Sequence, residues 1–274
     1  MGNYLKLVNF EIQRFWKFLM ALIALVIVVQ IIGAFVDTSA FLNQAERTMQ
    51  QEKIAESQYV FNYNVYSLYH FLNSGLFLIS VMFTIAVLII YVFFIWYRDW
   101  LGKSSFIYRL LMLPTERRNV YFAKLTAILL FVLCLVGVQV VLLQIVDFII
   151  QWKIPEQLRA DMDTIIVYSH DYLELLFPHS LLQFVFIYAL GGTCVAIVFT
   201  AILLERSYSL KGIFLAALYI IVSGAVMLTP IIIYLNTTYF YKQEIRLMII
   251  VCSILMLAAA IFIANYLLKR KINV

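Results

Sequence analysis

The stretch GLFLISVMFTIAVLIIYVFFIWY, residues 75–97, decides the fold class of this chain. It contains no charged residue and no proline. A helix rises about 1.5 Å per residue, so a run of this length crosses the roughly 30 Å hydrocarbon core of a bilayer. Its apolar residues follow one another without the alternation that strands of a membrane barrel require. The stretch therefore predicts a membrane-spanning helix.

The rest of the chain repeats this pattern. Of its 274 residues, 65% are hydrophobic and 13% are charged, and the mean hydropathy is +0.96. Water-soluble domains are nearer half apolar and could not bury this much apolar surface. We predict an all-α polytopic membrane protein, folded as a single transmembrane domain over residues 1–274. Its six transmembrane helices are expected at residues 18–36, 75–97, 125–146, 181–204, 213–235 and 247–268.

Lysine and arginine are distributed unevenly between the two sides that these spans define. Fourteen of the 20 lie in the terminal segments and in the loops after spans two and four, whereas the other side carries six. Because cytoplasmic segments of membrane proteins are enriched in Lys and Arg, both termini are predicted to be cytoplasmic. The long loops 37–73 and 147–180 are then external, and we expect a multi-pass protein of the cytoplasmic membrane; the family resemblance given below implies that this membrane is bacterial. The same bias accounts for the net charge of +5 without a nucleic-acid partner, for which the chain has no motif.

Two segments on the inner side are predicted to be helical without crossing the membrane. At the N-terminus, apolar residues recur at helical spacing from Tyr4 to Trp16, which indicates an amphipathic helix leading into the first span. Between spans two and three, a mainly apolar segment follows Ser104 and Ser105 and stops at Pro114. Because serine caps helix starts and proline disfavours helix in the residue before it, a short interfacial helix is expected at about 104–114.

The residues around this segment carry a family resemblance. Leu-Met-Leu-Pro (111–114), Arg117-Arg118 and Ala-Lys-Leu (123–125) resemble the corresponding loop of ABC-2-type transporter permeases. That loop often has a leucine-rich turn, a proline, an arginine shortly after it, and an Ala-Lys pair that opens the third span. The chain is also similar to these permeases in its length, its six spans and its two cytoplasmic termini.

The resemblance implies that the helix at 104–114 is a coupling helix, which docks on a separate cytoplasmic ABC ATPase subunit and carries its closure into the membrane. It implies an exporter that moves a hydrophobic or amphipathic cargo, such as a peptide antibiotic, a lipid or a drug, by alternating access. The permease would pair in the lipid bilayer with a second copy of itself or with a sister permease. The residues implied at the ATPase-coupling interface are Phe106, Tyr108, Arg109, Met112, Leu113, Glu116, Arg117 and Arg118.

The chain is not expected to hydrolyse ATP itself. Gly102-Lys103-Ser104 matches the end of a P-loop, but the glycine required five residues before Gly102 is Tyr97, and a membrane span replaces the preceding strand. No cofactor is therefore predicted in this chain, and ATP and magnesium are expected on the partner ATPase. The three histidines lack a recurring ligand spacing, so neither a metal site nor a catalytic residue is predicted.

Two other functions remain open. One is a carrier or channel that ATP does not drive. Such carriers usually need acids or histidines inside the membrane, and the predicted spans offer one candidate, Asp147, near the end of the third. The other is a membrane sensor or immunity subunit that transports nothing. Polar positions in or near the spans either line a pathway or bond between helices, and they are Gln30, Gln139, Gln144 and Gln183.

Overall fold

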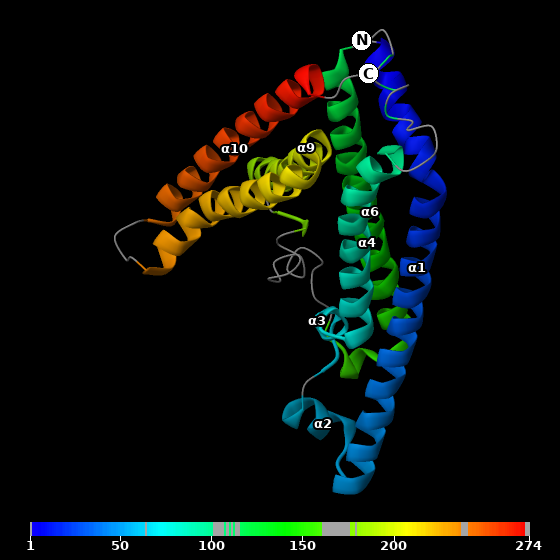
Figure 1. The fold of residues 1–274 in the computed structure, drawn as a ribbon. Coiled ribbons are helices and arrows are strands. Elements are labelled where there is room, and N and C mark those ends of the chain that lie inside the picture. The colour runs from blue at the N-terminus through cyan, green and yellow to red at the C-terminus, as the bar shows by residue number, and fades with distance from the viewer. Residues whose placement is uncertain are drawn as a thin grey trace. The chain divides into compact units, whose positions relative to one another are not determined.

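The computed structural model describes residues 2–63, 65–100, 107, 110, 112, 116–160, 176–178, 180–236 and 241–271. Within these residues almost all of the chain is helical, and the one extended pairing is an isolated bridge between Tyr66 and Arg159. The elements are α1 (Gly2–Glu52), α2 (Glu56–Asn62), α3 (Leu68–Leu72), α4 (Gly75–Trp100), α6 (Arg117–Lys153), the 3-10 turn η1 (Glu156–Leu158), α9 (Leu181–Asn236) and α10 (Lys242–Arg270) (Figure 1).

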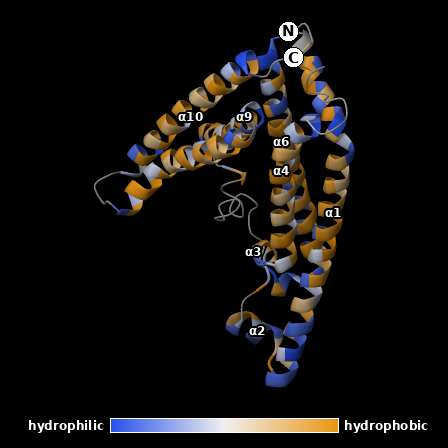
Figure 2. Ribbon diagram, in the orientation of Figure 1, coloured by the Kyte–Doolittle hydropathy of each residue, from blue (hydrophilic) through white to orange (hydrophobic). Residues whose placement is uncertain are grey.

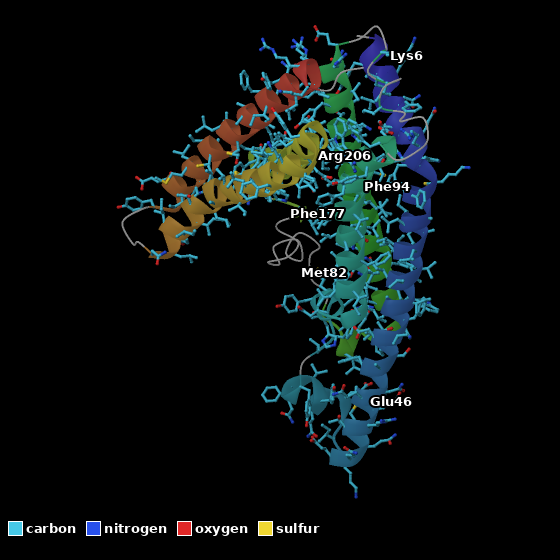
Figure 3. All side chains as sticks on the ribbon, viewed as in Figure 1. Lys6, Glu46, Met82, Phe94, Phe177 and Arg206 are labelled. Carbon is cyan, nitrogen blue, oxygen red and sulfur yellow. The ribbon has the colours of Figure 1, made fainter. Side chains whose placement is uncertain are left out.

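The prediction of an all-helical chain with six apolar helices long enough to span a membrane is confirmed. Figure 2 shows apolar residues along most of each long helix and hydrophilic residues gathered toward helix ends. Large apolar side chains such as Met82 of α4 (Figure 3) are exposed, which suits contact with lipid. Among the described residues the six segments are Tyr4–Glu52, Gly75–Trp100, Arg117–Lys153, Leu181–Tyr208, Leu210–Asn236 and Gln243–Arg270.

Helix α1 is longer than the predicted first span at both ends. It takes in the amphipathic N-terminal segment and continues through polar residues to Glu52. Lys53, the next residue, has a φ of 53°. A residue in this left-handed conformation is a common way for a helix to end. Hydropathy marked only the membrane part of α1, because the polar flanks belong to the same helix without being apolar.

Helix α9 contains the predicted spans four and five without an interruption of helical structure. Gly212 marks where the helix bends. A Cβ atom at this glycine would lie 2.5 Å from the carbonyl oxygen of Glu205 and 2.6 Å from that of Leu204. Residues seven apart in a straight helix are separated by about 10 Å along its axis, so the chain must turn back sharply here. The loop predicted between these spans is therefore a helical bend.

The chain divides into two compact units, each assembled from several segments. The terminal unit comprises residues 1–14, 89–130 and 181–274, and the central unit comprises residues 15–88 and 131–180. Helices α1, α4 and α6 contribute residues to both. The single domain over residues 1–274 stays a prediction.

An aromatic core fills part of the central unit. Tyr66 is fully buried there, and its hydroxyl donates a hydrogen bond to Asp37 Oδ2 at 2.6 Å. Its backbone joins the segment that follows α6: the N–H of Tyr66 donates to Leu158 O at 2.9 Å, and the N–H of Ala160 donates to Tyr66 O at 2.8 Å. Burial, and next the hydrogen bond to Asp37, raise the pKa of Tyr66 well above its ordinary value. Parts of the two predicted external loops are thus packed together.

The terminal unit has an aromatic core of its own. The ring of Phe199 makes edge contacts with Trp96 at 5.6 Å and with Tyr121 at 5.7 Å between centroids. Helix α10 packs along α9, and Thr200 Oγ1 donates to the carbonyl oxygen of Ala260 at 3.1 Å. Residues from α4, α6, α9 and α10 therefore share one interior, and the site described next lies in this unit.

Candidate functional site

Five charged side chains meet inside the terminal unit. Glu11 and Arg14 come from the start of α1, Arg98 and Asp99 from the last turn of α4, and Lys124 from the first turns of α6. We refer to these five residues as the charge cluster. The two helices α4 and α6 directly precede and follow the segment predicted to couple to an ATPase, so the cluster lies where that segment joins the helices.

Lys124 is the centre of the cluster. Its Nζ atom donates to Glu11 Oε1 at 2.7 Å, to Asp99 Oδ2 at 2.5 Å and to the carbonyl oxygen of Ile95 at 3.0 Å. An ammonium group has three hydrogens to donate, so all of them are used. The same nitrogen lies 5.2 Å from the centroid of the Trp96 ring, within the range of a cation–π contact.

Each carboxylate accepts a second bond from an arginine. Arg14 donates to Asp99 Oδ1 at 2.7 Å, and Arg98 donates to Glu11 Oε2 at 2.9 Å. All four carboxylate oxygens of the cluster are therefore bonded to a cation. The arginines retain some contact with solvent, with side-chain exposures of 24% and 18%, whereas Lys124 has none.

Because the cluster is buried, the loss of any one of its charges should reduce the stability of the protein strongly. Glu11, Asp99 and Lys124 are 2%, 0% and 0% exposed. A charge removed from water must be compensated, and deleting one partner of a buried pair typically costs about 3–5 kcal/mol because the remaining charge is left unpaired. Removing any one of these partners should therefore lower the stability of the contact between the three helices by several kcal/mol. The cluster thus connects the start of α1, the end of α4 and the start of α6 through buried ion pairs.

The predicted coupling residues are only partly within the described structure. Phe106, Tyr108, Arg109 and Leu113 lie outside the described residues. Met112 is 68% exposed, while its described neighbours Ile107 and Leu110 are 0% and 5% exposed. This segment thus has buried apolar positions and at least one large apolar side chain on its outside.

The remaining three predicted coupling residues stand at the start of α6. Arg117 donates to the carbonyl oxygen of Leu268, in the last turn of α10, at 2.8 Å. Arg118 forms an exposed ion pair with Glu116. The coupling role of all eight predicted residues stays a prediction, but Arg117 is already engaged inside the terminal unit.

The four glutamines predicted in or near the spans fall into different settings. Gln30 and Gln139 are buried in the central unit and exchange two hydrogen bonds of 3.0 and 3.1 Å, and Gln30 Nε2 also donates to Ser80 Oγ at 2.9 Å. These bonds join α1, α4 and α6, which is the helix-bonding alternative of the prediction. Gln144 is exposed on α6, and Gln183 is half-buried on α9 in the other unit. A pathway-lining role for the four stays a prediction.

Sequence reasoning missed the charge cluster. It placed Lys124 among the basic residues that lead into the third span and gave it no partner, whereas this lysine is fully buried inside the helical segment Arg117–Lys153. A signal was present, because Asp99 and Glu11 are two of only four acids on a side rich in basic residues. The partners are separated by 113 and 25 positions, so their pairing is visible only in the fold.

Comparisons with known proteins add no identification. Neither a scan against protein-family models, nor a search of curated proteins, nor a search of solved structures finds a match to this chain. Among the described residues, no group of three or more His, Cys, Asp or Glu side chains is placed to hold a metal ion.

Proposed function

We propose that this chain is the permease subunit of an ATP-driven ABC exporter, which works as a pair of permeases above two cytoplasmic ATPase subunits. The family basis is the resemblance of residues 111–125 to the coupling loop of ABC-2-type permeases. The observation that carries the proposal is the charge cluster. It joins the N-terminal helix to both helices that flank the proposed coupling segment. An ATPase that moves this segment would therefore displace these helices first.

The proposed mechanism needs a joint that transmits displacement. When the ATPase subunits close on ATP, they move the segment between α4 and α6. A flexible attachment would absorb this movement locally. Because Lys124 bonds α1 and α4 at once, from a site without solvent, the start of α1 and the adjoining ends of α4 and α6 move together. The spans then shift from inward-facing to outward-facing.

An open apolar groove supports the cargo class. It lies in the terminal unit between the first half of α9 and α10 and has a volume of about 560 Å³. Its wall includes Phe186, Leu190 and Ile254, and the polar side chains Thr193 and Ser253 bond to their own helices. Sites for small molecules commonly measure about 300–1,000 Å³ and are mostly apolar. A hydrophobic or amphipathic cargo fits this chemistry.

The charge cluster is poorly suited to the competing function of a proton-driven carrier. A proton relay needs a carboxylate oxygen that can take up and release a proton during transport. In the cluster every oxygen of Glu11 and Asp99 already accepts a bond from Lys or Arg. The arrangement therefore favours a structural joint over a relay.

The proposal is tested by isolating the chain from native membranes under mild detergent. We expect an ATPase subunit with a complete P-loop to copurify. Replacing Tyr108, Arg109 and Met112 together by Ala should remove that subunit or abolish its cargo-stimulated ATP hydrolysis. The matched control is Arg47→Ala with Phe61→Ala, an exposed cation and aromatic on the side predicted to be external. Export by the purified chain with no ATPase bound would contradict the proposal, and capture of an ATPase that never responds to cargo would favour a sensor.

A further inference from the structure

A small cavity lies between the beginning of α6 and the end of α10. Its volume is about 130 Å³. Arg118, Tyr121 and Phe122 of α6 form one wall, at positions i, i+3 and i+4 of a single helix face. The opposite wall is one face of α10, and it consists of Ile261, Ala264, Asn265 and Leu268.

The cavity has an apolar side and a polar side. Phe122, Ile261 and Leu268 supply hydrocarbon, and Ala264 is the small residue that leaves the space open. The polar groups are the Arg118 guanidinium and the Asn265 amide. Asn265 Oδ1 is shielded from solvent and accepts no hydrogen bond within the described structure. A buried amide oxygen without a partner is costly, so a ligand that donates to it would be stabilising.

These groups lie near helix ends, a position that suits the headgroup layer of a bilayer. Arg118 is the second residue of α6, and Asn265 lies five residues before the end of α10, which is about 7.5 Å along the helix axis. The headgroup region adds roughly 5–7 Å on each side of the hydrocarbon core. If both helices span the membrane, the polar side of the cavity lies among lipid headgroups, and its apolar side meets the first carbons of the acyl chains.

The charge around the cavity is strongly positive. At the start of α6, Arg117 and Arg118 accompany one acid, Glu116, and at the end of α10 the sequence is Lys-Arg-Lys (269–271). Arg270 and Lys271 extend over the rings of Tyr266 and Tyr208 at 5.6 and 5.3 Å, which keeps both cations at this end of the unit. The start of α6, with Glu116 before it, and the end of α10, with Lys271 after it, together carry five cations and one carboxylate among the described residues.

We propose that this cavity binds the headgroup of an anionic phospholipid. Arg118 donates to the phosphodiester, and Asn265 Oδ1 accepts a hydrogen bond from a headgroup hydroxyl beside it, as the glycerol of phosphatidylglycerol offers. The inference does not depend on the proposed transport function. The ion pair of Arg118 with Glu116 does not block it, because both side chains are more than half exposed and such pairs contribute little stability. Lipid phosphate can therefore replace Glu116 at Arg118.

The experiment is a lipid titration of the purified chain in a neutral detergent, followed by native mass spectrometry. The probes are phosphatidylglycerol, phosphatidylcholine and inorganic phosphate. Phosphatidylglycerol should bind more tightly than phosphatidylcholine, and excess inorganic phosphate should not displace it. Arg118→Gln should weaken phosphatidylglycerol binding by about fivefold, the change expected for one basic side chain near an anionic surface. Asn265→Leu should weaken it while leaving the net charge unchanged.

Lys211→Gln is the matched control, because it removes an exposed basic residue of α9 that does not line the cavity. Because the charge of Lys211 does not contact the bound headgroup and is screened by salt, the change should leave the affinity within about twofold of wild type. The inference is overturned if Arg118→Gln and Asn265→Leu, both purified as folded monodisperse protein, bind phosphatidylglycerol as wild type does. Equal affinity for phosphatidylcholine, or displacement by inorganic phosphate, overturns it as well. Should both variants aggregate, the salt dependence of wild-type binding decides: an affinity that does not fall as NaCl is raised contradicts the proposal.

Discussion

Lys124 illustrates how much one side chain in this protein depends on partners that are distant in the sequence. Its ammonium group lies between Glu11 and Asp99 and is closed off from solvent by Trp96 and the backbone of Ile95. By composition alone it is one of 20 basic residues, most of which serve to orient the chain. Its burial follows from the carboxylates that α1 and α4 bring to it. Sequence reasoning could place the lysine near a span but could not pair it.

Replacing Lys124 by Met tests the weight of the charge cluster. The change keeps the length of the side chain and removes its charge, so two buried carboxylates lose a donor. The free energy of unfolding should fall by about 3–5 kcal/mol, as for other buried pairs that lose one partner. Thermal or denaturant unfolding in detergent, followed by circular dichroism, measures the loss. Lys211→Met, at an exposed position, should change it by less than about 0.5 kcal/mol, and equal values for the two variants would refute a structural cluster.

Tyr66 gives a prediction about pH. Its pKa is raised in the folded protein by burial and by the hydrogen bond to Asp37. Above about pH 10 the unfolded chain releases a proton that the folded chain keeps, so the unfolded state binds fewer protons and stability falls as pH rises. Below that pH the contribution is constant. Wild type should therefore lose thermal stability between about pH 10 and 11.5 more steeply than Tyr66→Phe.

The Tyr66→Phe variant needs its own reference, because the change also deprives Asp37 of a donor. We expect it to be less stable than wild type by about 1–2 kcal/mol at neutral pH. The difference between the two proteins should then shrink as the pH rises. Parallel melting curves across the alkaline range would show that Tyr66 does not titrate differently on folding.

At the scale of elements, hydropathy predicts the long helices but not where they end, continue or bend. The apolar runs predicted six spans because uncharged stretches of this length have few other stable environments. The unbroken continuity of the first span with the polar helical stretch that ends at Glu52, and the bend of α9 at Gly212, were not predicted. Both depend on local backbone geometry in polar or mixed segments, where hydropathy carries no information. The contact between the two predicted external loops through Tyr66 likewise needed the fold.

Gly212→Ala tests the bend of α9. The added methyl group would lie 2.5 and 2.6 Å from two backbone carbonyl oxygens, which a side-chain movement cannot relieve. The bend must open, so we expect a loss of at least about 2 kcal/mol in stability. Gly224→Ala in the same helix is the control, because a Cβ there meets nothing within 4 Å. If both alanine variants melt at the wild-type temperature, α9 does not bend as described.

For the whole molecule, the amino-acid sequence was enough to predict an integral membrane protein. It was not enough to predict the two units or the charge cluster. Composition and the six spans made it an integral membrane protein, and the described helices agree. The division into two units, each drawing on the same three helices, was not predictable from a linear pattern. The charge cluster belongs wholly to the terminal unit, so a force on the segment between α4 and α6 would act first on that unit.

A single crosslinking experiment tests the central claim most directly. The three native cysteines are replaced by serine, Met112 is replaced by cysteine, and native membranes are treated with a thiol-specific photo-crosslinker; Met112 is chosen because it is 68% exposed. We predict a crosslink to a cytoplasmic P-loop ATPase, with a yield that changes when ATP is bound, whereas cysteine at exposed Phe61 gives none. Labelling of the Met112 cysteine by an impermeant reagent from outside intact cells would contradict the account, as would the absence of any ATPase among its crosslinked partners.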